Sequence, residues 1–158
     1  MTQLVLDQTK LFAPVAGQVT SLDKAPDTDL RHKRMRIGFA IEPTDSMIYS
    51  PVDGVVTSTF PTRHAIGITS GALQLLVYFG IDTIDLNGEP FENFVHVGDT
   101  VTPETAIAAM DLAAIEMAGK QTTVTVLLYD TDIQLQSYQL LTKHRVAAGT
   151  LTAEIITR

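Results

Sequence analysis

The apolar stretches of this sequence are short, and that shortness is what most limits the folds open to it. Val, Ile and Thr alternate or cluster in each stretch, and Gly, Pro, Asp or Ser separates one stretch from the next. Such residues favour pleated, half-buried backbone, and short strands at regular spacing are typical of an all-β domain. We therefore expect a β-sandwich or barrel. The expected strands include QVTSL, GVVTSTF, HAIGIT, LQLLVYF, TTVTVLLY and HRVAAGTLTAEIIT.

One segment has a helical pattern instead. In DLAAIEMAG, Asp111 is a suitable N-cap and Gly119 a suitable stop. Leu112, Ile115 and Met117 give the segment an apolar side. Because the segment is short, we expect a small helix packed at a sheet edge.

Length and composition exclude several classes of protein. The 158 residues suffice for one domain, which would bury about 70% of the surface of its unfolded chain. Since no linker divides the sequence, we expect a single domain over residues 1–158. No apolar run approaches the roughly 18 to 20 residues that span a bilayer, and no signal-peptide pattern is present, which predicts a cytoplasmic protein. There is no cysteine, and the net charge of -7 argues against nucleic acid as a partner.

A short motif occurs twice in the first half of the chain. APVAGQV and SPVDGVV share Pro-Val-x-Gly-x-Val, and their prolines, Pro14 and Pro51, lie 37 positions apart (51 − 14 = 37). Gly17 and Gly54 then mark equivalent turns. Two interpretations stay open: an internal duplication, or turn chemistry that Pro and Gly provide in unrelated loops.

The candidate chemistry is concentrated in PTRHAIGITSGALQLLVYFGIDT, which has the pattern of a β-hairpin. A three-residue Ser-Gly-Ala loop would place His64 opposite Tyr78, with Cβ atoms about 4.5 to 5.5 Å apart. A two-residue loop would instead pair His64 with Val77 and turn Tyr78 to the other face. We favour the three-residue loop because Gly71 can take a positive φ. A His64–Tyr78 pair is then the expected centre of a site.

Several motifs occur in the order in which the glucose-class enzyme IIA domains of the bacterial phosphoenolpyruvate-dependent sugar phosphotransferase system carry them. They are APVAGQV, GFAIEP, YSPVDGVV, PTRHAIGI, YFGIDTIDLNGEPF, VGDTV and MDL. The chain resembles this family over nearly its whole length. The resemblance implies an antiparallel β-sandwich with one or two short peripheral helices. It also implies a phosphocarrier without a cofactor, which takes phosphate from phospho-HPr and passes it to an enzyme IIB domain of a sugar permease.

The resemblance further implies which residues form the site. In the family two histidines face each other in a shallow apolar depression. The first corresponds to His64, which Thr62 orients by a hydrogen bond, and Asp82 borders the depression. The second, the phosphoacceptor, corresponds to Tyr78 in this chain. Contacts with protein partners are expected from Leu30, Phe60 and Phe79, and contact with the membrane only through the permease.

The tyrosine at position 78 bears on the mechanism. A neutral imidazole has an unprotonated ring nitrogen and forms a labile phosphoramidate. A phenol is protonated at neutral pH, and its phosphate ester is a poor donor for onward transfer. We therefore expect an enzyme IIA-type component that is impaired in ordinary His phosphotransfer, which leaves open whether the chain is an enzyme. The alternative is a non-catalytic regulatory or ligand-binding protein that keeps the fold and has regulatory protein partners.

Two further departures from the family lie near the expected site. The family usually has an apolar Pro-Val-Phe patch where this chain has Thr-Asp-Leu, ending at Leu30, and the hairpin connection is one residue shorter. The basic run RHKRMR, residues 31–36, is either a solvated loop or an attraction for an acidic partner or a phosphate-bearing ligand. The remaining histidines lack metal-ligand spacing, so no metal site is expected; they are His32, His96 and His144.

Overall fold

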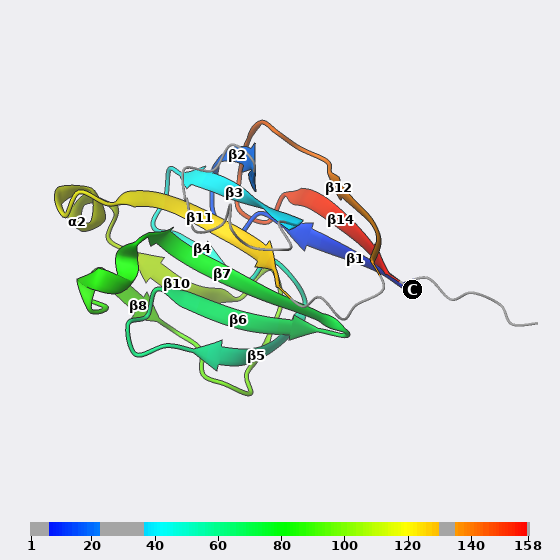
Figure 1. Cartoon of the computed structure of the whole chain (residues 1–158), viewed down its shortest axis with the longest axis horizontal. Helices are drawn as coiled ribbons and strands as arrows, with labels where there is room; N and C mark the ends of the chain where they lie inside the picture. The colour runs from blue at the N-terminus through cyan, green and yellow to red at the C-terminus, as the bar shows by residue number, and fades with distance from the viewer. Residues whose placement is uncertain (1–6, 23–36, 130–134, 158) are drawn as a thin grey trace, which may run out of the picture.

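The computed structural model describes residues 7–22, 37–129 and 135–157, and Figure 1 shows their arrangement. Every strand pair in this part of the chain is antiparallel, which confirms the expected all-β class. The strands are β1 (Asp7–Phe12), β2 (Gly17–Ser21), β3 (Ile37–Pro43), β4 (Met47–Tyr49), β5 (Gly54–Thr59), β6 (Ala65–Ser70), β7 (Leu73–Ile81), β8 (Phe91–Asn93), β9 (Thr100–Val101), β10 (Ala106–Met110), β11 (Gln121–Leu128), β12 (Leu135–Leu140), β13 (Arg145–Val146) and β14 (Leu151–Thr157).

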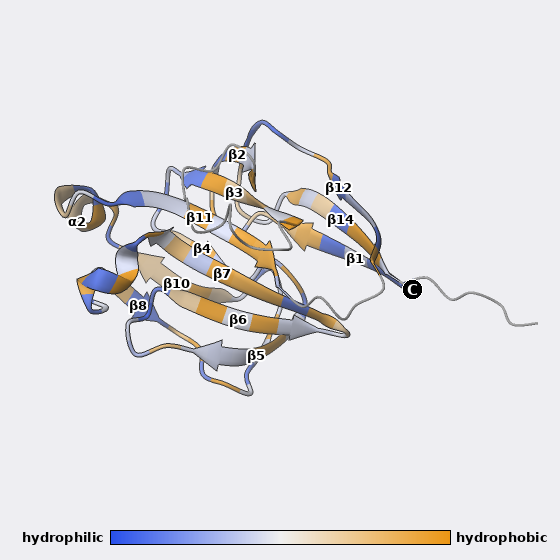
Figure 2. Cartoon of the chain, in the orientation of Figure 1, coloured by the Kyte–Doolittle hydropathy of each residue, from blue (hydrophilic) through white to orange (hydrophobic). Residues whose placement is uncertain are grey.

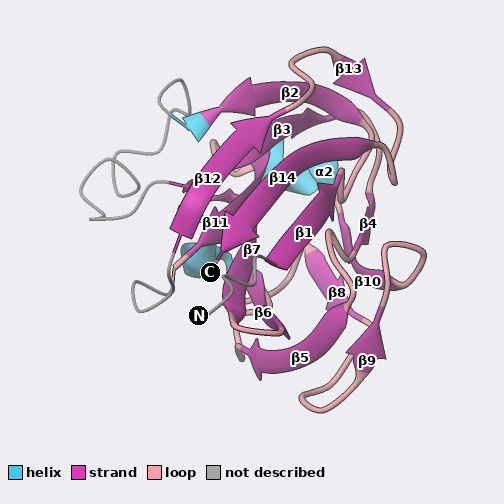
Figure 3. Cartoon of the chain, turned by 90° about the vertical axis from the view of Figure 1, so that its right-hand side faces the viewer, coloured by secondary structure: helices cyan, strands magenta, loops and turns pink. Residues whose placement is uncertain are grey.

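Three sheets contribute to one apolar core. The large sheet has the order β13-β2-β3-β11-β7-β6-β5-β9, and the two small sheets have the orders β1-β14-β12 and β4-β10-β8. Buried side chains from all three sheets form a single cluster, which includes Phe39, Ile66 and Phe79 from the large sheet and Ile48 and Ile155 from the small ones. Figure 2 shows the hydrophobic segments along β6, β7 and β11, and Figure 3 shows β12, β14 and β1 side by side.

The expected helix is present as α2 (Leu112–Met117), and a short 3-10 turn, η2 (Thr83–Leu86), follows β7. The side chain of Asp111 accepts a hydrogen bond from the N–H of Ala114 at 3.1 Å, which confirms the predicted cap. Gly119 has a φ of 79°, as a helix stop requires. The predicted apolar side is only partly right, because Ile115 is buried whereas Met117 is 88% exposed.

The two Pro-Val-x-Gly-x-Val motifs begin two copies of one structural unit. The N–H of Phe12 donates to the carbonyl of Pro51 at 2.8 Å. The N–H of Tyr49, which lies 37 positions after Phe12, donates to the carbonyl of Pro14 at 2.7 Å. The motifs therefore hold each other by reciprocal hydrogen bonds, and the structure supports the interpretation as an internal duplication.

The equivalence extends through the large sheet. Gly17 pairs with Val146 in the same way as Gly54 pairs with Val101, so β13-β2-β3-β11 matches β9-β5-β6-β7 strand for strand. We call β1, β2, β3, β11, β13 and β14 the first copy, and β4, β5, β6, β7, β9 and β10 the second copy. The second copy is almost continuous in sequence, whereas the first combines segments from both sides of it. The copies meet where β7 pairs with β11.

Close packing explains the repeated glycines. A Cβ atom at Gly17 would lie 2.1 Å from the carbonyl oxygen of Glu42, and one at Gly54 would lie 2.5 Å from that of Thr69. Neither distance leaves room for a side chain, and in both cases the obstructing atom belongs to the backbone of the next strand. The motif therefore uses glycine to let two strands approach closely.

Candidate functional site

The β6–β7 hairpin carries the expected site, with a register that differs from the expected one. Ser70 pairs with Leu73, so the loop contains two residues, and Ala65 rather than His64 lies opposite Tyr78. The expectation of a three-residue loop is therefore wrong. The two-residue alternative that pairs His64 with Val77 is not found either, because Gly71 and Ala72 form the loop and His64 lies level with Phe79. Gly71 does take a positive φ, of 58°. A positive φ at the first of two loop residues is a feature of the type II′ turn, which suits the twist of a hairpin.

Tyr78 lies on the outward face of β7. Strand residues alternate between faces, and Val77 and Phe79 on either side of Tyr78 are buried in the core. The half-buried ring of Tyr78 packs instead against a small outer cluster formed by Leu22 and Leu127. Among the described residues its hydroxyl has no hydrogen-bond partner. In the described part of the chain, Tyr78 therefore packs its ring on apolar side chains and leaves its hydroxyl group unpaired.

His64 reaches Tyr78 from a bend just before β6. The N–H of Phe79 donates to the carbonyl of His64 at 2.8 Å, which fixes the backbone of His64 beside β7. The imidazole and phenol centroids lie 6.5 Å apart, with the ring planes inclined at 39°. The ring of Phe60 lies on the imidazole as well, with centroids 5.4 Å apart. His64 and Tyr78 are thus neighbours even though they are not a cross-strand pair.

A strained turn presents His64 to the site. Arg63, immediately before it, has a φ of 57°, a conformation that is uncommon for residues other than glycine. The N–H of Arg63 donates to the carbonyl of Phe60 at 2.9 Å, and the side-chain amide of Asn93 reaches the carbonyl of Arg63 at 3.4 Å. Sequence reasoning did not single out Arg63 or Asn93. No local signal marks a left-handed arginine, because its conformation depends on these contacts from outside the segment.

The imidazole of His64 is oriented and partly desolvated. Oγ1 of Thr62 and Nδ1 of His64 lie 2.6 Å apart and share a hydrogen bond. Burial lowers the pKa of His64 from its ordinary value, so the neutral imidazole predominates at neutral pH. Nε2 has no hydrogen-bond partner in the described part of the chain. When Thr62 donates to Nδ1, Nε2 carries the proton and can donate to a bound anion; when Nδ1 donates to Thr62, Nε2 has a free lone pair.

The segment after β7 turns sharply beside the two rings. Gly80 and Asp82 have positive φ values of 80° and 59°. Thr83, which is buried, donates its hydroxyl hydrogen to the carbonyl of Phe79 at 2.5 Å and anchors the start of η2. The side chain of Asp82 is exposed, and its carboxylate has no partner among the described residues. Asp82 is therefore held at the edge of the site by its backbone rather than by its side chain.

The residues expected to contact partners do not share one environment. Phe60 is half-buried beside His64. Phe79 points into the core with 0% exposure, and its ring lies 6.1 Å from that of Phe91. The expectation of Phe79 as a partner contact is therefore wrong, because the alternation that exposes Tyr78 buries its neighbour. Leu30 and the basic run 31–36 lie outside the described residues.

Two further findings concern the described part of the chain as a whole. No three His, Asp or Glu side chains in it gather closely enough to hold a metal ion. His96 is near Asp99, with Nδ1 and Oδ2 3.9 Å apart, but both belong to an exposed turn.

None of the helices in the described part of the chain is long and apolar enough to cross a membrane.

Comparisons with known proteins give the same family. The sequence model for the "phosphoenolpyruvate-dependent sugar phosphotransferase system, EIIA 1" family matches residues 9–133. The chain is 37% identical over 147 residues to the "PTS system glucose-specific EIICBA component" of Streptococcus pneumoniae, with 92% of this chain and 20% of that protein covered. It is 33% identical over 140 residues to the "PTS system glucose-specific EIIA component" of Halalkalibacterium halodurans, with 88% and 80% covered.

A solved structure agrees with the sequence relatives. "Glucose permease IIA from Mycoplasma capricolum" superposes with a TM-score of 0.84 at 25% identity, with 94% of this chain and 96% of that chain covered. The chain spans about a fifth of the length of the EIICBA relative and about four-fifths of the single EIIA component. The fold, the family model and these relatives together show that the chain belongs to the EIIA 1 family of the phosphoenolpyruvate-dependent sugar phosphotransferase system.

Proposed function

We propose that this chain is an EIIA-type phosphotransferase component in which ordinary His phosphotransfer is impaired. The observation that carries the proposal is the ring pair of His64 and Tyr78, 6.5 Å apart. The pair provides one imidazole and one phenol where two imidazoles are expected for the family. The partners by resemblance are phospho-HPr as donor and an enzyme IIB domain as receiver. The glucose-specific names of the relatives favour a glucose-class permease.

The chemistry of the pair supports impairment rather than a simple change of acceptor. Phosphotransfer to a ring nitrogen needs an unprotonated nitrogen and gives a labile phosphoramidate, and a protonated phenol offers neither. His64 is suited to a supporting role, because Thr62 holds Nδ1 and leaves Nε2 to donate to a phosphoryl oxygen. Without an imidazole at position 78, that donor has no phosphohistidine beside it.

Replacement of Tyr78 by histidine tests the proposal directly. The protein is incubated with phosphoenolpyruvate, enzyme I and HPr, and acid-labile phosphate on the chain is measured. We expect labelling of Tyr78→His and little or none of the unsubstituted chain. Leu76→His is a matched control, because Leu76 lies two residues away on the same face of β7. Equal labelling of the unsubstituted chain and Tyr78→His would overturn the proposal.

A non-catalytic regulatory role is the second candidate, and one observation favours it. Tyr78 is packed into the outer cluster with Leu22 and Leu127, so the hydroxyl rests on an ordered apolar base suited to recognition. The candidate predicts that HPr or an enzyme IIB domain binds the unsubstituted chain and that His64→Ala or Tyr78→Ala weakens this binding. Binding that is insensitive to both variants would exclude recognition through the ring pair.

A further inference from the structure

The turn that presents His64 is tied to a strand of another sheet. The side-chain amide of Asn93 donates to the carbonyl of Arg63, with Nδ2 and O 3.4 Å apart. No other donor in the described part of the chain bonds to that carbonyl. Asn93 ends β8, in the small sheet β4-β10-β8, whereas Arg63 lies just before β6 of the large sheet. The bond from Asn93 therefore crosses from the small sheet to the turn.

Gly88 packs on the same turn. It is buried and has a φ of 81°. A Cβ atom at Gly88 would lie 3.4 Å from the carbonyl oxygen of Thr62 and 3.5 Å from that of Pro61. It would also lie 3.5 Å from Cδ of Arg63. The segment before β8 thus supports the turn by close packing, and Asn93 adds the hydrogen bond.

The conformation of Arg63 decides whether the imidazole of His64 is oriented. The hydrogen bond between Oγ1 of Thr62 and Nδ1 of His64 spans Arg63, the single residue between them. Arg63 is in the left-handed region, with a φ of 57°. Relaxation of Arg63 to a more favourable region would redirect the two side chains on either side of it. The bond that fixes the imidazole therefore depends on a residue that Asn93 holds.

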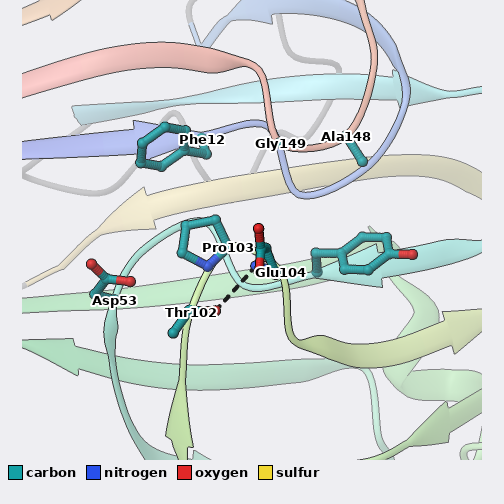
Figure 4. Close-up of a pocket in the computed structure, with 8 residues that line it drawn as sticks. Phe12, Asp53, Thr102, Pro103, Glu104, Ala148 and Gly149 are labelled. Atoms are coloured by element: carbon teal, nitrogen blue, oxygen red, sulfur yellow. Dashed lines mark hydrogen bonds between the residues drawn. The ribbon is translucent and has the colours of Figure 1, made fainter.

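The internal duplication provides a comparison for Asn93. The turn before β10 matches the turn before β14 at an offset of 45, since Val101 and Val146 hold equivalent places (146 − 101 = 45). At that offset Glu104 is the counterpart of Gly149. Figure 4 shows these two residues on opposite sides of one pocket, each on its own turn. The strands that follow the turns, β10 and β14, are therefore counterparts as well.

The edge strands β8 and β12 correspond at their partners. Asn93 pairs with Ala108 on β10 as Leu140 pairs with Ala153 on β14. The two alanines are 45 positions apart (153 − 108 = 45), so Leu140 is the counterpart of Asn93. Because β12 has an apolar leucine at this place, the framework does not need an amide there. The contact that distinguishes Asn93 is its hydrogen bond to Arg63.

We propose that Asn93 is a positioning residue for His64. By holding Arg63 in the left-handed region, Asn93 keeps Thr62 in hydrogen-bond contact with Nδ1 of His64. The imidazole then stays beside Tyr78, with the ring centroids 6.5 Å apart. Any effect of Asn93 on phosphotransfer rests on the proposed function, whereas its effect on the ring of His64 does not.

Asn93→Leu, which introduces the residue of the first copy, tests this role. The ¹⁵N shifts of the His64 ring report its tautomers and the hydrogen bond at Nδ1. We expect Asn93→Leu to move these shifts toward the intrinsic tautomer ratio, in the same direction as Thr62→Val. Asn93→Ala, which removes the amide without adding volume, is expected to act in the same way. In the double variant Thr62→Val, Asn93→Leu we expect no further movement, because the bond through which Asn93 acts is already lost.

Gln18→Leu is the matched control. Nε2 of Gln18 donates to the carbonyl of Lys143 at 2.8 Å, so this variant also removes an amide-to-carbonyl hydrogen bond between a strand and a loop. We expect it to leave the ring shifts of His64 unchanged, whatever its effect on stability. Three outcomes would overturn the role of Asn93: unchanged ring shifts in Asn93→Leu and Asn93→Ala, equal changes in Gln18→Leu, or a full additional change in the double variant.

Labelling with phosphate gives a second measurement. In the Tyr78→His background, Asn93→Leu is expected to lower the initial rate of acid-labile labelling from phospho-HPr by about tenfold, because a misplaced imidazole no longer meets the phosphoryl group. Gln18→Leu in the same background is expected to keep the rate, and an unaltered rate in Asn93→Leu would contradict positioning for transfer. If Tyr78→His takes no label, the proposed function fails, whereas the ring shifts of His64 still decide the role of Asn93.

Discussion

The two copies of the duplicated unit share a framework but differ in their chemistry. Ile41 and Ile68 both pack on a motif glycine, so β3 matches β6 at an offset of 27 (68 − 41 = 27). His64 is therefore the counterpart of Ile37 (64 − 37 = 27). The second copy also carries Asp53 and Glu104 where the first copy has Ala16 and Gly149, at offsets of 37 and 45. The first copy has apolar or small residues at all three places.

Tyr78 is a further place at which the two copies differ in chemistry. It pairs with Ala65 on β6, as Leu127 pairs with Gly38 on β3, so Leu127 is its counterpart. The framework accepts an apolar leucine at that place in one copy and a tyrosine in the other. The comparison teaches that the same framework accommodates either set of side chains, so it does not need the polar groups of the second copy.

The largest expected effect is a loss of stability on substitution of the motif glycines, which both copies share. Gly17→Ala and Gly54→Ala each place a Cβ atom against the backbone of the next strand, and we expect each to lower the free energy of unfolding by about 2 to 3 kcal/mol. Gly71→Ala meets nothing within 4 Å and is expected to cost only about 1 kcal/mol, from its positive φ. Urea unfolding followed by circular dichroism measures all three. A near-neutral Gly17→Ala would break the equivalence.

The next expected effect separates Leu127 from Tyr78. Leu127 is 1% exposed, so Leu127→Ala is expected to cost about 2 kcal/mol, the lower end for a core leucine, because its cluster is small. Tyr78→Phe is expected to change the stability by less than about 0.5 kcal/mol, because the hydroxyl has no partner to lose among the described residues. Chemical unfolding of both variants provides the measurement. A large loss in Tyr78→Phe would show a structural role for the hydroxyl.

The next prediction concerns the titration of His64, which its counterpart Ile37 cannot show because isoleucine has no ionisable group. Because burial lowers the pKa of His64, the unfolded chain binds a proton at this residue before the folded one does. The contribution of His64 to stability is therefore complete above its ordinary pKa and declines as pH falls toward the lower folded pKa. We expect NMR titration of the imidazole to give a midpoint below about 6.5. Phe60→Ala, which removes the covering ring, is expected to raise it.

The smallest expected effect concerns the tautomer of His64. Thr62→Val removes the hydroxyl that contacts Nδ1 but keeps the shape of the side chain. We expect the unfolding free energy to change by about 1 kcal/mol or less and the two neutral tautomers to approach their intrinsic ratio. The ¹⁵N shifts of the ring report that ratio. Unchanged ¹⁵N shifts would mean that contacts other than Thr62 orient the imidazole.

The sequence carries enough local information to predict most of the expected strands, the helix cap and the hairpin, but not the register of the hairpin. The expected strand HRVAAGTLTAEIIT is in fact two, β13 and β14, because a turn at Gly149 with a φ of 86° divides it. Gly71 takes a positive φ in either loop, and its site is open to solvent, so nothing nearby distinguishes the two registers. The burial of Phe79 could have been found, since it follows from the alternation that turns Tyr78 outward. The conformation of Arg63 could not, because contacts from Phe60 and Asn93 hold it.

Only part of the duplication can be recognised in the sequence, namely the turn motifs and not the strands. The turns share their glycines because close backbone approach demands them, and they share their prolines as well. The strands kept only their apolar character, which many sequences satisfy. The offset of 45 between Val101 and Val146 has no comparable motif, so hydrogen-bond register alone reveals it.

The pairing of β1 with β14 has a mechanical consequence. Asp7 lies opposite Thr157, so the two outer ends of the described chain share one rung of an antiparallel ladder. A pulling force applied through these ends would load the hydrogen bonds between β1 and β14 one pair after another, and not all at once. Strands β1 and β14 would therefore separate from their outer ends inward, starting at the pair of Asp7 and Thr157.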